Sequence, residues 1–199
     1  MSSSAKNHLV FDLETSGLPE CESYGVYYPE SDTSKYDSSR IVQIAYLVYD
    51  CKNAEVKRVN KIIRPEGFVI KNSEFHGITQ EMALKGDDFG SVAMELAKDL
   101  KGCDTLVSHN IKFDFNVLSA ELFRRGLGDI LALVKGMGKE CTMELSKGVC
   151  KIKRGSHIKD PKLTEAYAFI VKKEVSGKLH DAMTDVVLCA EIYHALKFL

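Results

Sequence analysis

Residues 8–18 read His-Leu-Val-Phe-Asp-Leu-Glu-Thr-Ser-Gly-Leu and place two acids in and beside a short apolar run. The apolar residues up to Leu13 predict a buried strand, which a turn at Gly17 follows. Asp12 and Glu14 are two residues apart, so both side chains project from the same face of this strand, with Cα atoms about 7 Å apart. Because an unpaired charge in such a run costs several kcal/mol, the pair is interpreted as part of a metal site. An acidic pair at the exposed end of a strand is the alternative.

Two further acids lie on predicted helices at positions that face the core. Asp114 lies one turn before Val117, and Asp185 lies one turn before Cys189 on a stripe that is otherwise apolar. Both acids are near a helix N-terminus, where the helix dipole and capping also favour a carboxylate, so a structural explanation stays open for each. A core-facing acid needs a partner, and a cation shared with Asp12 would supply it.

His180 lies five residues before Asp185, just outside the predicted last helix. A lone histidine is more often structural than catalytic. One beside a metal cluster is well placed to remove a proton from a water molecule. The four acids and His180 are spaced as two divalent cations and a phosphodiester would require, so the sequence predicts a metal-dependent nuclease.

The composition is that of one folded domain, residues 1–199, with 45% hydrophobic residues. No run of about 18 apolar residues occurs, so no membrane span is expected. The first seven residues, Met-Ser-Ser-Ser-Ala-Lys-Asn, lack the apolar stretch of a secretory signal. The six cysteines contain no Cys-x-x-Cys pair, which argues against structural zinc. Reduced thiols in a cytoplasmic or nuclear compartment are expected instead.

The charge is distributed unevenly along the chain. A net charge of −1 argues against a protein that coats nucleic acid wholesale. Residues 135–178 nevertheless hold eleven Lys and Arg against five Asp and Glu. A solvated loop is one explanation of this excess, and a surface that tracks phosphates is the other.

The rest of the sequence predicts a mixed α/β fold. Strands before residue 65 and an alternation of helix and strand afterwards indicate a mixed sheet with helices on both faces. The expected strands cover residues 8–13, 41–49, 56–63 and 104–108, and the expected helices cover residues 79–84, 89–100, 113–125, 161–171 and 182–199.

Two segments are harder to assign. Residues 19–39 are polar and are expected to form a long loop, which is usually functional or mobile. Its tyrosines could stack on bases or pack the loop onto the body of the protein. The tyrosines of residues 19–39 are Tyr24, Tyr27, Tyr28 and Tyr36.

Residues 129–160 hold an apolar run at 130–134, several glycines and a possible helix from Thr142.

Three segments resemble the motifs of the DEDDh exonucleases, the DnaQ-like group that contains the proofreading subunit of bacterial replicative polymerase, RNase T and oligoribonuclease. Residues 12–18 look like the first motif, residues 109–114 (His-Asn-Ile-Lys-Phe-Asp) like the second, and residues 180–185 (His-Asp-Ala-Met-Thr-Asp) like the third. Residues 76–79, His-Gly-Ile-Thr, resemble a further segment typical of the proofreading-subunit branch. The matches occur in the right order and cover nearly the whole chain.

The resemblance implies an RNase H-like fold, with a five-stranded mixed sheet whose second strand is antiparallel. It also implies 3′-to-5′ removal of nucleoside 5′-monophosphates from DNA or RNA by a two-metal mechanism. Asp12, Glu14, Asp114 and Asp185 would hold two Mg²⁺ or Mn²⁺ ions, and His180 would activate the attacking water. The implied partner is a nucleic acid with a free 3′ end, expected to be single-stranded.

The resemblance also implies a set of substrate contacts around the terminal nucleotide. Small and apolar residues at such positions serve packing as well. The implied contacts are Leu13, Thr15 at the terminal sugar, Leu18 as a wedge near the terminal base, and His76, Asn110 and Phe113 in the pocket of the terminal nucleotide.

Two features depart from the proofreading subunit. Residues 19–39 are longer than its direct turn, and the chain ends within or just after its last helix, without a polar tail for docking a polymerase. These features favour a free-standing exonuclease, although a polymerase partner stays possible.

Two rival functions are open. A catalytically silent nucleic-acid-binding module of the same fold need not retain all four acids and His180. A metal-dependent endonuclease is disfavoured by His180, since the RNase H branch lacks this histidine arrangement. The sequence predicts neither a preference for DNA or RNA nor an oligomeric state.

Overall fold

The computed structural model describes residues 7–175 and 179–197. Its main sheet has the strand order β5-β4-β1-β6-β7. β4 is antiparallel to both of its neighbours, whereas β6 is parallel to β1 and β7 is parallel to β6. The expected five-stranded mixed sheet with an antiparallel second strand is therefore confirmed. The strands are β1 (His8–Thr15), β4 (Ile41–Tyr49), β5 (Glu55–Ile62), β6 (Thr105–Ser108) and β7 (Gly138–Cys141).

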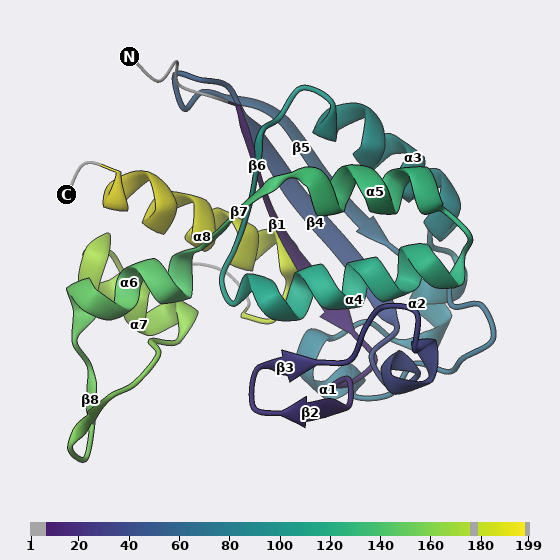
Figure 1. The fold of residues 1–199 in the computed structure, drawn as a ribbon, viewed down its shortest axis with the longest axis horizontal. Coiled ribbons are helices and arrows are strands. Elements are labelled where there is room, and N and C mark those ends of the chain that lie inside the picture. Colours follow the sequence, from purple (N-terminus) through teal and green to yellow (C-terminus); the bar gives the residue numbers. More distant parts are fainter. Residues whose placement is uncertain (1–6, 176–178, 198–199) are drawn as a thin grey trace.

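Helices cover both faces of this sheet (Figure 1). Among the described residues none of these helices is long and apolar enough to cross a membrane. The helices are α1 (Ser73–His76), α2 (Gln80–Leu84), α3 (Phe89–Leu100), α4 (Ile111–Arg124), α5 (Gly128–Gly136), α6 (Thr142–Cys150), α7 (Leu163–Ile170) and α8 (Ala182–Leu196).

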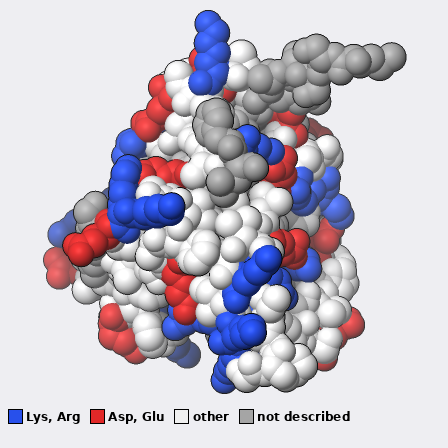
Figure 2. Space-filling view, turned by 90° about the vertical axis from the view of Figure 1, so that its left-hand side faces the viewer, with Lys and Arg blue, Asp and Glu red and all other residues white. Residues whose placement is uncertain are grey.

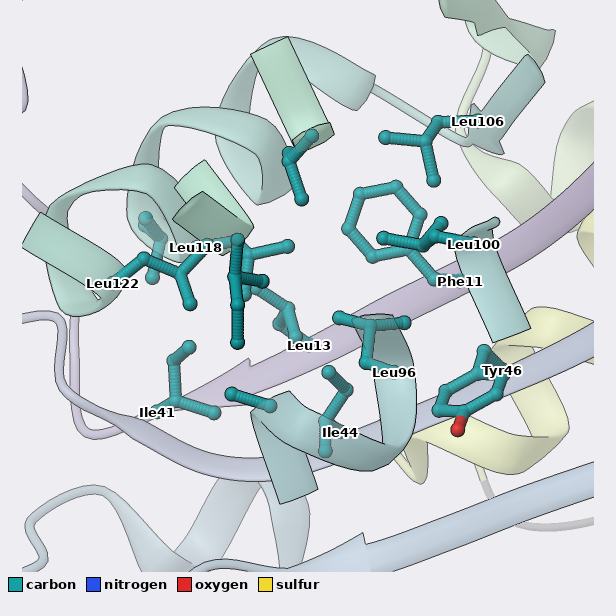
Figure 3. Packing of buried hydrophobic residues seen from close by; sticks show 14 of the residues in the cluster. Phe11, Leu13, Ile41, Ile44, Tyr46, Leu96, Leu100, Leu106, Leu118 and Leu122 are labelled. Atoms are coloured by element: carbon teal, nitrogen blue, oxygen red, sulfur yellow. The ribbon is translucent and has the colours of Figure 1, made fainter. Parts of the chain in front are cut away.

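The alternation of side chains along β1 separates two cores and positions the acids. Phe11 and Leu13 point to one face and pack in the larger core with residues of α3, α4 and α5 (Figure 3). Val10 points to the other face and packs against α8. Asp12 and Glu14 are on the same side of the strand as Val10, because side chains alternate with a period of two. Both acids therefore project from the sheet face that α8 covers.

The segment 19–39 is not simply a loop. It contains a short hairpin, β2 (Cys21–Ser23) and β3 (Val26–Tyr27), and a 3₁₀ helix, Thr33–Tyr36. Tyr36 is buried and its hydroxyl donates a hydrogen bond to the carbonyl of Tyr28 at 2.5 Å, so this part packs onto the body. Tyr24, in contrast, is 94% exposed.

The segment 129–160 also contains more structure than the sequence predicts. Its apolar run lies in α5, and a helix begins at Thr142 as expected. The strand β7 and the hairpin of β8 (Lys153–Arg154) and β9 (His157–Ile158) were not predicted.

The ends of the last two predicted helices need small corrections. The helix expected over 161–171 covers Leu163–Ile170, since Pro161 precedes its first turn. The last described helix ends at Leu196, and the predicted end at Leu199 lies outside the described residues.

Candidate active site

Four acids from three separate segments converge beside the carboxyl end of β1. Asp12 and Glu14 come from β1, Asp114 from the first turn of α4, and Asp185 from the first turn of α8. The pKa of Asp12 is raised well above its ordinary value, first by burial and then by the charges of Asp114, Asp185 and Glu14. The four carboxylates are thus close enough to repel one another.

Asp114 is held in place by two neighbouring groups. It is 2% exposed, and it accepts hydrogen bonds from the Ser108 hydroxyl at 2.7 Å and from the backbone N–H of Leu13 at 3.2 Å. Burial raises its pKa to about 7, although these hydrogen bonds oppose the shift. The site therefore fixes the carboxyl group while disfavouring its charge.

Asp185 is the acid with an unsatisfied oxygen. Its Oδ1 is buried and has no hydrogen-bond partner in the part of the chain that the structure describes. Burial raises the pKa of Asp185 to about 6, and the imidazole of His180 partly offsets this rise. Buried carboxylate oxygens normally accept a hydrogen bond, so Oδ1 of Asp185 is available to a partner that the protein itself does not supply.

Glu14, His180 and Asp185 form a group that could hold a metal ion. Each offers one ligand atom, and these atoms all lie within 4.8 Å of one another. His180 is exposed and its backbone is left-handed, with φ 59°. The imidazole of His180 is therefore accessible to solvent beside the acids.

The donor set fits a hard divalent cation. Carboxylate oxygens are the ligands that Mg²⁺ and Mn²⁺ prefer. Neither Asp12, Asp114 nor Asp185 forms an ion pair with a lysine or arginine within the described ranges. A bound cation would lower the raised pKa values of these acids and would satisfy the free oxygen of Asp185.

Gln43 and Asp181 support the site and were not predicted from the sequence. The Gln43 amide nitrogen donates to Asp181 Oδ1 at 3.1 Å, and its oxygen accepts from the backbone N–H of Ala182 at 3.3 Å. Asp181 caps α8 by accepting from the backbone N–H of Thr184 at 3.1 Å. Because Gln43 is paired with Glu14 across β4 and β1, it ties the start of α8 to the strand that carries the acids. A polar residue inside the apolar run 41–49 was the available signal.

A family model described as an exonuclease, RNase T, matches residues 9–193. The chain belongs to this exonuclease family. The resemblance of its three motifs to the DEDDh group is thereby confirmed.

The exonuclease resembles part of a curated polymerase subunit. It is 28% identical over 113 residues to the DNA polymerase III subunit epsilon of Treponema pallidum (strain Nichols), a match that covers 56% of this chain and 44% of the relative. The chain thus matches less than half the length of this curated relative.

Three solved structures share the RNase H-like fold of this exonuclease. One is E. coli Exonuclease I in complex with a dA16 oligonucleotide, with a TM-score of 0.68, 16% identity and coverage of 97% of this chain and 41% of that chain. Another is Exonuclease X in complex with 5′ overhanging duplex DNA, with a TM-score of 0.60, 19% identity and coverage of 96% and 91%. A third is a 3′-exonuclease from a study of the 3′-end specific recognition of a histone mRNA stem-loop, with a TM-score of 0.69, 16% identity and coverage of 98% and 65%.

Three of the predicted substrate contacts of the exonuclease also serve its own structure. The side chain of Leu13 is 4% exposed and lies in the core, so that only its main chain could contact a substrate. The hydroxyl of Thr15 donates to the carbonyl of Gly17 at 2.7 Å and so holds the turn after β1. Phe113 is partly buried and packs against the same core as Leu13.

The other three predicted contacts line separate hollows. Leu18 is 75% exposed and lines a hollow of about 610 Å³ with Phe68 and Asn72. His76 lines a hollow of about 390 Å³ that also includes Asp181. Asn110 lines a groove of about 750 Å³ beside the β2–β3 hairpin. The volumes fall within the roughly 300–1,000 Å³ that ligand sites occupy.

Proposed function

We propose that the chain is a metal-dependent 3′-to-5′ exonuclease that releases nucleoside 5′-monophosphates from DNA or RNA. The convergence of Asp12, Glu14, Asp114 and Asp185 beside His180 is the observation that carries this proposal. Membership of the exonuclease family supports it, and the raised pKa values of three of the acids indicate a site that is completed by cations.

In this proposal the four acids hold two Mg²⁺ or Mn²⁺ ions. Bound cations would stabilise negative charge on the attacked phosphate and on the leaving 3′ oxygen. The exposed imidazole of His180 accepts a proton from the attacking water, while Asp185 favours the resulting positive charge. The water oxygen bonds to phosphorus, the bond from phosphorus to the 3′ oxygen breaks, and the shortened strand leaves with a 3′ hydroxyl.

The proposed substrate is a nucleic acid strand with a free 3′ end. The similar solved structures carry DNA or concern a histone mRNA stem-loop, so both sugars have to be compared for this chain. A polymerase partner is not part of this proposal, because the match covers only 44% of the curated relative that is named as a polymerase subunit.

Degradation of 5′-labelled oligonucleotides tests the proposal directly. With Mg²⁺ or Mn²⁺, we expect single-stranded DNA or RNA to shorten progressively from the 3′ end, and EDTA should stop the reaction. Asp12→Asn is the matched inactive control, because it removes a charge and keeps the side-chain shape. Binding of both strands without any shortening would instead identify a silent nucleic-acid-binding module.

A further inference from the structure

We propose that the groove beside the β2–β3 hairpin binds the part of the strand that lies 5′ of the cleaved nucleotide, with Tyr24 as a platform for base stacking. This inference rests on the proposed function and adds an element that lies outside the three motifs. The partner it specifies is single-stranded nucleic acid, several nucleotides long.

The groove lies between the β2–β3 hairpin and the N-terminal ends of α4 and α6. It is lined on the hairpin side by Cys21 and residues 23–27, and otherwise by Asn110, Lys112, the start of α6 and Asp160. Asn110 is the residue that precedes α4, the helix that carries Asp114 in its first turn. The groove and Asp114 therefore share the N-terminal end of α4, where a strand in the groove would approach the acid cluster.

The hairpin is anchored at its base while its tip is exposed. The backbone N–H of Glu20 donates to the carbonyl of Lys35 at 2.8 Å, and the buried Tyr36 holds the carbonyl of Tyr28. Tyr24 lies at the turn beside Gly25, whose φ is 72°. The exposed ring of Tyr24 is thus presented on a fixed support. Single-strand-binding proteins use aromatic rings in this way, since every base has a face that can stack.

The acids that line the groove are neutralised by lysines. The two acids that line it are each paired with a lysine, Glu144 with Lys112 at 3.1 Å and Asp160 with Lys147 at 2.8 Å. Asp160 lies two residues after β9, so the β8–β9 hairpin ends close to the edge of the groove.

The β8–β9 hairpin supplies cations that the fold leaves without an acidic partner. Lys151, Lys153 and Arg154 are exposed, and across the described residues none of the three forms an ion pair. Figure 2 views the side on which this hairpin projects in Figure 1, and Lys and Arg side chains occur in both the upper and the lower half of that face. Exposed cations together with an aromatic platform form the combination that tracks a single strand.

Two substrates distinguish the contribution of the groove from that of the acid cluster. A 5′-fluorescein 12-nucleotide strand spans both, whereas the p-nitrophenyl ester of thymidine 5′-monophosphate occupies the acid cluster alone. We expect Tyr24→Ala to raise KM for the strand about 5- to 150-fold, from the loss of roughly 1–3 kcal/mol of base stacking. Hydrolysis of the ester should be unchanged, and Tyr24→Trp should restore KM for the strand.

Phe169→Ala is the control, since Phe169 is 51% exposed on α7 and does not line the groove. It should leave both substrates unaffected. An unchanged KM for the strand in Tyr24→Ala, or an equal loss on strand and ester, would overturn the inference. Run with DNA and RNA strands in parallel, the assay shows which sugar the groove accepts.

Binding without catalysis distinguishes this inference from the proposed function. Fluorescence anisotropy of the same strand in Ca²⁺ measures affinity even if wild type cleaves nothing. Weaker binding by Tyr24→Ala then supports the groove, while the absence of cleavage in Mg²⁺ and Mn²⁺ counts against the nuclease alone.

The salt dependence of binding tests the basic hairpin. Each phosphate contact on a single strand contributes a slope of about 0.7 in log Kd against log salt. Joint replacement of Lys151, Lys153 and Arg154 by serine should lower the slope by about 2. An unchanged slope would remove the hairpin from the strand path.

Discussion

Asp114→Asn tests whether burial of the Asp114 carboxylate destabilises the metal-free fold. Asp114 is 2% exposed, and burial raises its pKa from 3.8 to about 7. A carboxyl group with a raised folded-state pKa stabilises the fold fully below its unfolded pKa, and this stability is lost as the pH rises through the folded pKa. The difference of about three pKa units, at about 1.4 kcal/mol each, corresponds to a loss of about 4 kcal/mol above pH 7 in metal-free protein.

Asparagine removes this loss and keeps the local geometry. Its oxygen can accept from the backbone N–H of Leu13, and its amide can donate to the hydroxyl of Ser108, which are the groups that hold the carboxylate. In EDTA at about pH 8, we expect the free energy of unfolding of the variant to exceed that of wild type by about 2–4 kcal/mol. This difference corresponds to a melting temperature roughly 4–16 °C higher. At about pH 4 the two proteins should differ by less than about 1 kcal/mol.

Urea unfolding at both pH values measures this difference. Glu22→Gln is the control for a change of charge, since Glu22 is exposed and forms no ion pair in the described part of the chain. Millimolar Mn²⁺ should stabilise wild type and should have less effect on Asp114→Asn. Destabilisation by asparagine at pH 8, or a gain that does not vary with pH, would refute the reasoning.

Three further substitutions address the base, the scaffold and the alignment of α8. His180→Ala should lower kcat about 10²–10⁴-fold while calorimetry still detects Mn²⁺ binding; an unchanged kcat would remove His180 from the mechanism. In the wild type, the buried guanidinium of Arg40 donates hydrogen bonds of 2.7 and 2.9 Å to the carboxylate of Glu121. Glu121→Ala removes this carboxylate and should lower the free energy of unfolding in urea by about 3–5 kcal/mol. A decrease of less than about 1 kcal/mol would contradict this prediction. Gln43→Leu removes the hydrogen bond between β4 and Asp181 and should lower kcat about 10-fold or more, because α8 is then misplaced. Loss of stability with an unchanged kcat would show a purely structural role for Gln43.

The centre of the sheet and the placement of two acids followed from periodicity. The run that ends at Leu13 is buried, and the period of two placed Asp12 and Glu14 together on the side of α8. The apolar stripe of the last helix likewise placed Asp185 toward the sheet, because its later members Cys189 and Ile192 are buried. Local patterns were sufficient here, since burial of one face determines them.

The edge of the sheet did not follow from local pattern. Residues 138–141, Gly-Lys-Glu-Cys, show no apolar alternation, and β7 forms because its backbone pairs with β6. The strands of the two small hairpins have only two or three residues each, too few to show a period. β7 thus depends on a contact between segments that are distant in the sequence, whereas the hairpins are local but too short for a pattern.

The supporting residues of the site depend on three-dimensional contacts in the same way. Nothing in the residue type of Ser108 indicates a bond to Asp114, which requires the turn from β6 into α4. Gln43 could have been noticed, because it interrupts an apolar strand as Asp12 does. Its partner Asp181 becomes identifiable only when α8 lies against β4.

The central claim is that distant acids jointly bind a pair of cations. A crystal soaked with Mn²⁺ and a nucleoside 5′-monophosphate tests it most directly through the anomalous scattering of manganese. Two anomalous peaks in contact with Asp12, Glu14, Asp114 and Asp185 are predicted. An occupied nucleotide site without a manganese peak among these four carboxylates would contradict the account.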